Sequence, residues 1–351
     1  MTVFYIIVAI LLFGILIFVH ELGHFTAAKC SGVRVNEFSL FMGPALWKKQ
    51  KGDTLYALRC IPIGGYCSME GESEESDDPR AFSKASVWKR LVILVAGSFS
   101  NFLIGFVMTL VIVAFGFQII PTTEIAGIQE GRPFAAVLQE GDRIHAVDGR
   151  RVYVSDDVTL LLDRDADGVH DLVIIRDGEK ITLNDVDLAR DYVSEEGKAL
   201  YGFSLKVEEK NLWNVLSYSF NESVNFGRMV WMTLGDLFRG QAAVSEVSGV
   251  VGIVGAVAEV GTQSESVGLG LLNVLYLFAF IAINLGVMNL LPIPALDGGR
   301  VVCLLVTAAA EKILRRKIDP KYEMYLHGVF MVLLMLLMAV LVFKDVIFLF
   351  K

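Results

Sequence analysis

A metal-binding motif lies at the end of an apolar stretch that is long enough to cross a membrane. Residues 3–19 form an uninterrupted apolar run, and a helix over them would span a bilayer core of about 30 Å. The run leads into His20-Glu21-Leu22-Gly23-His24, where two histidines four residues apart share one face of a helix. Two such imidazoles suit one zinc ion, and Glu21 could activate a zinc-bound water. Because ionisable residues inside a membrane usually serve function, we favour a zinc site over histidines that merely end the helix.

The composition of the chain is that of an integral membrane protein. Hydrophobic residues make up 54% of the 351 residues, which is more than an ordinary soluble domain carries. The formal net charge of -8, together with the lack of a basic stripe interleaved with aromatic residues, disfavours nucleic acid as a partner. The four cysteines form no Cys-x-x-Cys pair, so we expect free thiols. The lipid bilayer is the expected environment.

The first transmembrane helix, over residues 1–29, is followed by a loop over residues 30–87 that is predicted to contain a β-hairpin. The loop is rich in lysine and arginine, which places it in the cytoplasm by the positive-inside rule. Residues 33–40 and 54–60 have the character of strands. The following Ile61-Pro62-Ile63-Gly64-Gly65-Tyr66 should bend and approach another segment closely, because it holds a proline and two glycines. We therefore expect a membrane-associated hairpin beside the metal motif.

A second transmembrane helix is expected over residues 88–118. It contains Gly97-Ser98-Phe99-Ser100-Asn101, where small residues four apart permit close helix packing. Asn101 needs a polar partner within the bundle. Two interpretations of Asn101 stay open, a purely structural contact and a role beside the active site.

Residues 122–209 have the composition of a soluble, extracytoplasmic domain. Residues 134–149 indicate a short helix, a turn and a strand, and a hairpin is predicted across Asp177-Gly178. The pattern from Ala136 to Gly149 resembles that of a PDZ domain. His145 and His170 are expected at the surface of this domain.

The remaining third of the chain alternates between ambiguous and strongly apolar segments. Residues 210–268 are expected to form a connector, in part an amphipathic helix on the membrane and in part irregular. The third transmembrane segment, residues 269–311, should be unwound where Pro292 and Pro294 prevent a regular helix. Irregular backbone at membrane depth is tolerated only when it is buried in protein or lines a wet cavity. A fourth transmembrane helix is expected over residues 325–350.

A catalytic zinc normally has three protein ligands and one open position. Asp297 is the best third candidate, because it is the carboxylate of the broken membrane segment and its end of the span faces the same side as His24. Glu37 and Cys303 are weaker alternatives. Glu21 would take a proton from the attacking water and give it to the leaving amine, which is metal-assisted hydrolysis of an amide.

The chain resembles the site-2 protease family of intramembrane zinc metalloproteases, in particular its bacterial, PDZ-containing branch of regulated intramembrane proteolysis. The resemblance covers nearly the whole chain and is carried by four motifs, which are His20-Glu21-Leu22-Gly23-His24, Ile61 to Tyr66, Gly97 with Asn101, and Asn289 to Gly299. It implies a polytopic α-helical membrane protein of about four spans, with a membrane-associated β-hairpin and an inserted extracytoplasmic PDZ-like α+β domain. It also implies Zn²⁺ on His20, His24 and Asp297, with Glu21 as general base.

The same resemblance implies the substrates and their place in the cell. They would be single-span membrane proteins of the anti-sigma-factor type, cut first by an upstream site-1-type protease, or remnant signal peptides. The active site would lie near the cytoplasmic side of the inner or plasma membrane. Substrate contacts are expected from six residues: Asn289, Pro292, Pro294, Gly64, Gly65 and Asn101. Gly97-Ser98 departs from the family, which often has Gly-Pro there.

The alternative function is that of a membrane scaffold or metal-handling protein that binds partner C-termini through the PDZ-like domain. Glu21 disfavours it, because a structural or transport site has no need of a base beside the ligands.

Overall fold

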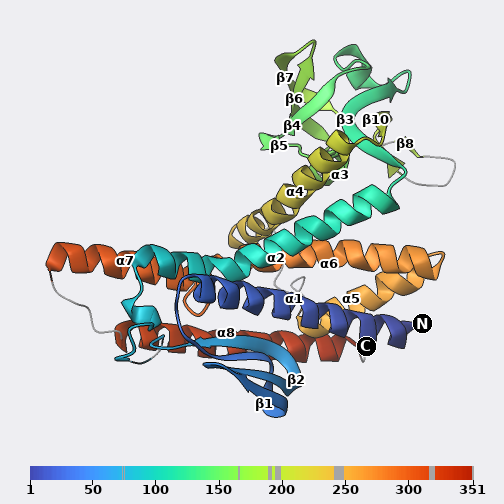
Figure 1. The fold of residues 1–351 in the computed structure, drawn as a ribbon. Coiled ribbons are helices and arrows are strands. Elements are labelled where there is room, and N and C mark those ends of the chain that lie inside the picture. Colours follow the sequence, from blue (N-terminus) through green and yellow to red (C-terminus); the bar gives the residue numbers. More distant parts are fainter. Residues whose placement is uncertain are drawn as a thin grey trace. The chain divides into compact units, whose positions relative to one another are not determined.

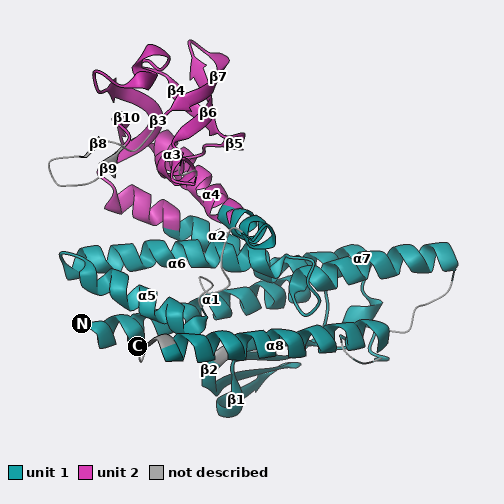
Figure 2. Cartoon of the chain, turned by 180° about the vertical axis from the view of Figure 1, so that it is seen from behind, with its two compact units in different colours: residues 1–108, 229–351 teal, residues 109–228 magenta. Residues whose placement is uncertain are grey.

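The computed structural model describes residues 1–72, 74, 76–164, 167–188, 192–193, 199–240, 249–315 and 321–349. These residues are mostly helical and include a β-sheet domain (Figure 1). They form two compact units, one of residues 1–108 with 229–351 and one of residues 109–228 (Figure 2).

Four helices in the described part of the chain are long and apolar enough to cross a membrane. They are α1 (Thr2–Cys30), α2 (Val87–Gly116), α6 (Val267–Asn289) and α8 (Lys321–Leu349). No proline interrupts any of them, so each continues through its apolar run. Their number agrees with the expected four or so spans. The third predicted segment divides, as its prolines require, into α6 and α7 (Asp297–Leu314).

The predicted hairpin consists of β1 (Val35–Lys51) and β2 (Thr54–Met69), and both strands run further than expected. Leu58 pairs with Leu40 on one side and Trp47 on the other, so β1 turns back between these two residues. Positive φ angles at Phe41 and Gly43 accompany this turn. Residues 65–69 pair only with residues 35–40 and form one edge of the sheet.

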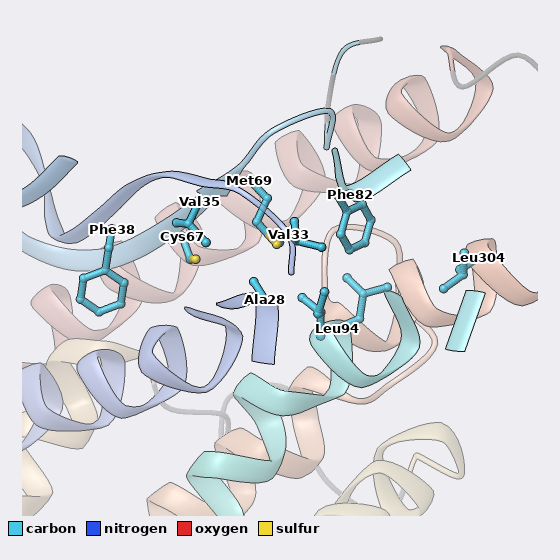
Figure 3. Close-up of a cluster of buried hydrophobic side chains, with 10 residues drawn as sticks. Ala28, Val33, Val35, Phe38, Cys67, Met69, Phe82, Leu94 and Leu304 are labelled. Atoms are coloured by element: carbon cyan, nitrogen blue, oxygen red, sulfur yellow. The ribbon is translucent and has the colours of Figure 1, made fainter. Parts of the chain in front are cut away.

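A cluster of buried apolar side chains joins the hairpin to the helical bundle (Figure 3). It draws on the end of α1, both strands, the short 3-10 helix η1 (Phe82–Lys84), α2 and α7. Each large apolar side chain that is fully buried contributes about 1.5–3 kcal/mol. The cluster therefore holds the hairpin against the ends of the helices. Its members are Ala28, Val33, Val35, Phe38, Cys67, Met69, Phe82, Ile93, Leu94 and Leu304.

Glycines let α2 approach both α1 and α6 closely. A Cβ atom added at Gly23 of α1 would lie 2.4 Å from the carbonyl oxygen of Ala96. A Cβ atom at Gly286 of α6 would lie 2.8 Å from the carbonyl oxygen of Ser98. Real Cβ atoms do not come this close, so larger residues would push the helices apart. The middle of α2 is thus held between two helices, as the small-residue pattern predicts.

The connector expected over residues 210–268 contains two helices, α4 (Leu212–Phe238) and α5 (Val250–Gln263). The expectation of irregular structure is wrong for α5. This helix packs on α1, where the ring of Tyr5 fills the space beside Gly261, and on α6. The segment consists largely of valine, glycine and alanine, so its sequence offers little contrast between polar and apolar positions, which explains the error. Residues 241–248 of the predicted connector lie outside the described residues.

Residues 109–228 hold a six-stranded sheet with the order β10-β3-β4-β6-β7, and with β5 beside β4. The hairpin across Asp177-Gly178 is confirmed, and both residues have the positive φ that such a turn requires. The elements of this unit are β3 (Ile119–Ile128), η2 (Pro133–Ala136), β4 (Arg143–Val147), β5 (Arg150–Arg151), α3 (Ser155–Leu162), β6 (Val169–Arg176), β7 (Glu179–Asp187), β8 (Tyr192–Val193), β9 (Ala199–Leu200) and β10 (Phe203–Glu209).

His170 is buried, so its expected surface position is wrong. Its Nδ1 lies 2.8 Å from the carboxylate of Asp148 at the turn after β4. The pairing of β4 with β6 brings the two residues together, and this pairing is a long-range contact that the local sequence does not reveal.

We expect a Gly286→Ala substitution to destabilise the bundle by about 1–3 kcal/mol, because the new methyl group meets the backbone of α2. Gly268→Ala is the matched control on the same helix, since nothing lies within 4 Å of its Cβ position. The control should be neutral or slightly stabilising. Thermal unfolding of the full chain in detergent measures both. Equal melting temperatures for the two variants would contradict the proposed packing.

Candidate metal centre

Three side chains from two distant segments converge on one point. His20 and His24 lie one turn apart on α1, and Asp297 is the first residue of α7. The Nε2 atoms of the two histidines are 3.3 Å apart. The Oδ2 atom of Asp297 lies 3.4 Å from Nε2 of His20 and 3.3 Å from Nε2 of His24. The structure therefore brings together the three residues that the sequence nominated as metal ligands.

The triangle of donor atoms fits a zinc ion. In a tetrahedral site with ligand distances of about 2.0–2.1 Å, neighbouring donor atoms are about 3.3–3.4 Å apart. Two imidazoles and one carboxylate are also a common catalytic donor set for zinc, with the fourth position open. The three side chains are only 10% to 15% exposed, so most of their surroundings is protein.

Helix α2 supplies hydrogen-bond partners to these side chains. The ring Nδ1 of His24 lies 2.8 Å from the carbonyl oxygen of Ile93 and can only donate to it. This tautomer leaves the lone pair on Nε2, which faces the donor triangle. Ser98 donates its hydroxyl to Oδ2 of Asp297 at 3.2 Å. Such contacts orient metal ligands and tune their affinity.

Asn101 supports the third ligand, His20. The Asn101 side chain is fully buried, and its amide group lies 3.3 Å from Nδ1 of His20. If Nε2 of His20 faces a metal ion, Nδ1 carries the ring proton, and the amide oxygen of Asn101 is then the acceptor. This orientation also gives a partner to that oxygen, which otherwise has none. Of the two interpretations left open by the sequence, the geometry favours a place beside the site.

Glu21 is a residue of α1, and its side chain lies beside the edge of the hairpin. A Cβ atom at Gly65 would lie 3.0 Å from Cγ of Glu21, so the predicted close approach of the Gly64-Gly65 segment is directed at this residue. Gly64 has a positive φ, yet the segment stays within β2 instead of leaving the sheet. The strand edge over residues 65–69 thus passes beside the motif.

The remaining predicted substrate contacts lie around the break between α6 and α7. Asn289 is the last residue of α6 and is half-buried, Pro292 is exposed and Pro294 is half-buried. Ala295 follows with a φ of 83°, a conformation that costs a non-glycine residue about 1–3 kcal/mol. Such strain persists where surrounding contacts hold it, so this turn has a fixed shape.

Glu37 and Cys303, the two weaker candidates for the third ligand, contact other residues. The carboxylate of Glu37 accepts hydrogen bonds from Arg59 at 2.6 Å and from the hydroxyl of Tyr66 at 2.7 Å. Cys303 groups with two residues of α8 instead of with His20.

Two contacts of the site were missed by the sequence analysis, the carbonyl of Ile93 and the hydroxyl of Ser98. Ile93, Gly97 and Asn101 recur every four residues and so share one face of α2. That spacing could have pointed to a face turned toward the histidines. Ser98 stands where the resembling family often has proline, and here its hydroxyl reaches Asp297.

Comparison with known proteins agrees with this geometry. Residues 8–337 match the model of peptidase family M50. A Clostridium acetobutylicum protein named "Putative zinc metalloprotease" is 34% identical, over 99% of both chains. Zinc metalloprotease RasP of Shouchella clausii is 28% identical, over 96% of this chain and 97% of its own length. Regulator of sigma-W protease RasP of Bacillus subtilis is 26% identical, over 97% and 98%.

We expect a Gly97→Ala substitution to weaken zinc binding at least about tenfold, because an added Cβ would lie 2.2 Å from Nε2 of His24 and displace its ring. Competition with a chromophoric chelator measures the affinity. Gly255→Ala on α5 is the control, since its Cβ position is open. Wild-type zinc affinity in the Gly97 variant would contradict the packing of His24 described above.

Proposed function

The chain belongs to peptidase family M50 and is a zinc metalloprotease, and from this premise we propose that it hydrolyses peptide bonds within or near the transmembrane segment of single-span membrane proteins. The observation that carries the proposal is the triangle of His20, His24 and Asp297 at the ends of apolar helices, beside an open strand edge. Because the family consists of peptidases, we disfavour the alternative function of a scaffold or metal-handling protein.

We assign the chemistry to four residues. His20, His24 and Asp297 would hold the zinc ion, since Nε2, Nε2 and Oδ2 of these residues face one another. Bound zinc supplies a Lewis acid for the scissile carbonyl and makes a nucleophile available at neutral pH. The carboxylate of Glu21 takes a proton from the attacking water and delivers it to the nitrogen of the leaving amine. Asn101 and Ser98 keep the ligands oriented.

The substrate must present an extended peptide. A transmembrane helix hides its amides in its own hydrogen bonds, so the substrate has to unwind before it can be cut. The edge over residues 65–69 can add an unwound segment as a further strand, because edge strands carry unpaired backbone groups. Gly65 allows the backbone to pass close to Glu21, and Gly64 allows it to pass close to Met42. We place Asn289, Pro292 and Pro294 on the other side of the bound peptide.

We propose an orientation in which the loop of residues 30–87 lies in the cytoplasm, because its lysines and arginines follow the positive-inside rule. The metal centre, at the end of α1 that leads into this loop, is then near the cytoplasmic side of the inner or plasma membrane. Residues 122–209, inserted between α2 and α4, are extracytoplasmic. We propose that they form the PDZ-like domain.

The inserted domain would exclude substrates whose outer part is still bulky. An upstream site-1-type protease would first trim that part, and the remaining single-span fragment would enter. The name of the Bacillus subtilis relative, a regulator of sigma-W, supports substrates of the anti-sigma-factor type. Remnant signal peptides are small enough to pass the same filter.

We expect Glu21→Gln to lower the rate of cleavage of a single-span substrate by a factor of about 10²–10⁴, the usual contribution of a general base. The variant should keep its zinc, because Glu21 is not one of the converging ligands. Cleavage in proteoliposomes and metal analysis of the purified chain are the measurements. Glu265→Gln, at an exposed position, is the control. Unchanged cleavage in the Glu21 variant would refute the assigned mechanism.

We expect deletion of residues 122–208 to permit cleavage of substrates that retain their outer domain. A substrate that has already been trimmed should be cut by both the full chain and the deletion variant, and it serves as the control for an intact metal centre. If untrimmed substrates stay resistant to an active deletion variant, the filter role is wrong.

A further inference from the structure

A histidine of α8 contacts the turn that precedes Asp297. Nδ1 of His327 lies 2.8 Å from the backbone nitrogen of Ala295. A backbone N–H can only donate, so Nδ1 of His327 is the acceptor. The contact joins the most C-terminal span to the break between α6 and α7.

The Ala295 N–H has no acceptor within its own turn. Pro292 and Pro294 have no N–H group to donate. The N–H groups of Ile293 and Leu296 bond to carbonyls inside the turn, at 2.7 Å and 3.0 Å. The Ala295 N–H is instead satisfied by the ring on α8, and the positive φ of Ala295 needs such an external contact to persist.

The turn is packed tightly against the first turn of α7. A Cβ atom at Gly298 would lie 2.2 Å from the carbonyl oxygen of Leu290, and one at Gly299 would lie 2.2 Å from that of Ile293. Backbone in such direct contact moves as one body. A shift of Ala295 is therefore transmitted to Asp297, two residues further on.

The residues around His327 resemble a second metal site. The hydrogen bond between Ala295 and His327 argues against a metal there. Cys303, Glu323 and His327 each offer a donor atom within 4.8 Å of the others. Since Nδ1 accepts from Ala295, the neutral ring carries its proton on Nε2, and that atom has no lone pair for a metal. Nε2 instead faces a carboxylate oxygen of Glu323 at 3.6 Å.

We propose that His327 is a positioning residue of the metal centre, which holds the turn at Ala295 and thereby places the carboxylate of Asp297 against His20 and His24. The proposal rests on the proposed role of Asp297 as a zinc ligand. It makes α8 part of the site, although α8 contributes no ligand.

Three substitutions of His327 separate the hydrogen bond from the shape of the side chain. Asn can place its amide oxygen where Nδ1 stands, whereas Leu has nearly the same shape without an acceptor. Gln remains polar but carries its acceptor farther out, which covers the case in which the Leu variant fails to fold. We expect H327L and H327Q to bind zinc about 10- to 100-fold more weakly than the wild type, and H327N to stay within about threefold.

Zinc affinity of the full chain in detergent is measured by chelator competition, and the absorption spectrum of the cobalt-loaded chain reports the ligand geometry. H327L should alter that spectrum, and H327N should restore it. Met324→Leu, an exposed position one turn away, is the matched control and should leave both readouts unchanged. Asp297→Asn is measured in parallel and should weaken zinc binding.

The outcomes are distinguishable. Wild-type affinity in H327L and H327Q, with weakened binding in D297N, would overturn the positioning role alone. Equal weakening in H327N and H327L would do the same, because the acceptor would then be irrelevant. A second zinc equivalent that is lost in both Cys303→Ala and H327L would replace the proposal by a metal site. Wild-type affinity in D297N would overturn the proposed ligand set itself.

Discussion

A polar group inside an apolar helical bundle needs a protein partner, because lipid offers no hydrogen bonds. In this protein that requirement shapes the metal centre. His20, His24 and Asp297 face one another, and α2 supplies hydrogen-bond partners to all three through Ile93, Ser98 and Asn101. The same requirement acts at the far end of α8, where Asp345 accepts the N–H of Gly252 at the start of α5.

Such partnerships are possible only where helices come very close. Gly23, Gly97 and Gly286 remove the side chains that would otherwise separate α1, α2 and α6. Gly23 lies against the backbone of Ala96, Gly97 against the ring of His24, and Gly286 against the backbone of Ser98. These close contacts bring the three helices together around the candidate ligands. Contacts of this kind orient metal ligands, so the proposed metal centre depends on them as well as on its ligands.

The site also needs regions in which regular structure ends. The turn between α6 and α7 presents Asp297, and the hairpin edge over residues 65–69, which pairs with β1 on one side only, passes beside Glu21. A closed bundle of continuous helices would hold a metal ion but could not receive an extended peptide. The hydrophobic cluster around Phe38 and Leu94 keeps the hairpin in place against the helix ends (Figure 3).

The sequence was informative where structure depends on neighbours along the chain. Apolar runs determined the four long helices, the spacing of His20 and His24 determined a shared helix face, and two prolines determined the break before Asp297. The Asp177-Gly178 hairpin followed from turn chemistry in the same way. The helix α5 and the burial of His170 escaped prediction, because both depend on packing against distant segments.

By itself, then, the sequence determined the spans, the metal motif and the position at which the third membrane segment breaks, since each is encoded within a few consecutive residues. Only the tertiary structure decided which carboxylate meets the two histidines, which atoms of α2 orient them, and that His327 of α8 holds the turn before Asp297. The physical reason is that hydrogen bonds between helices depend on how closely and at which points the helices pack, and that is a property of the whole fold.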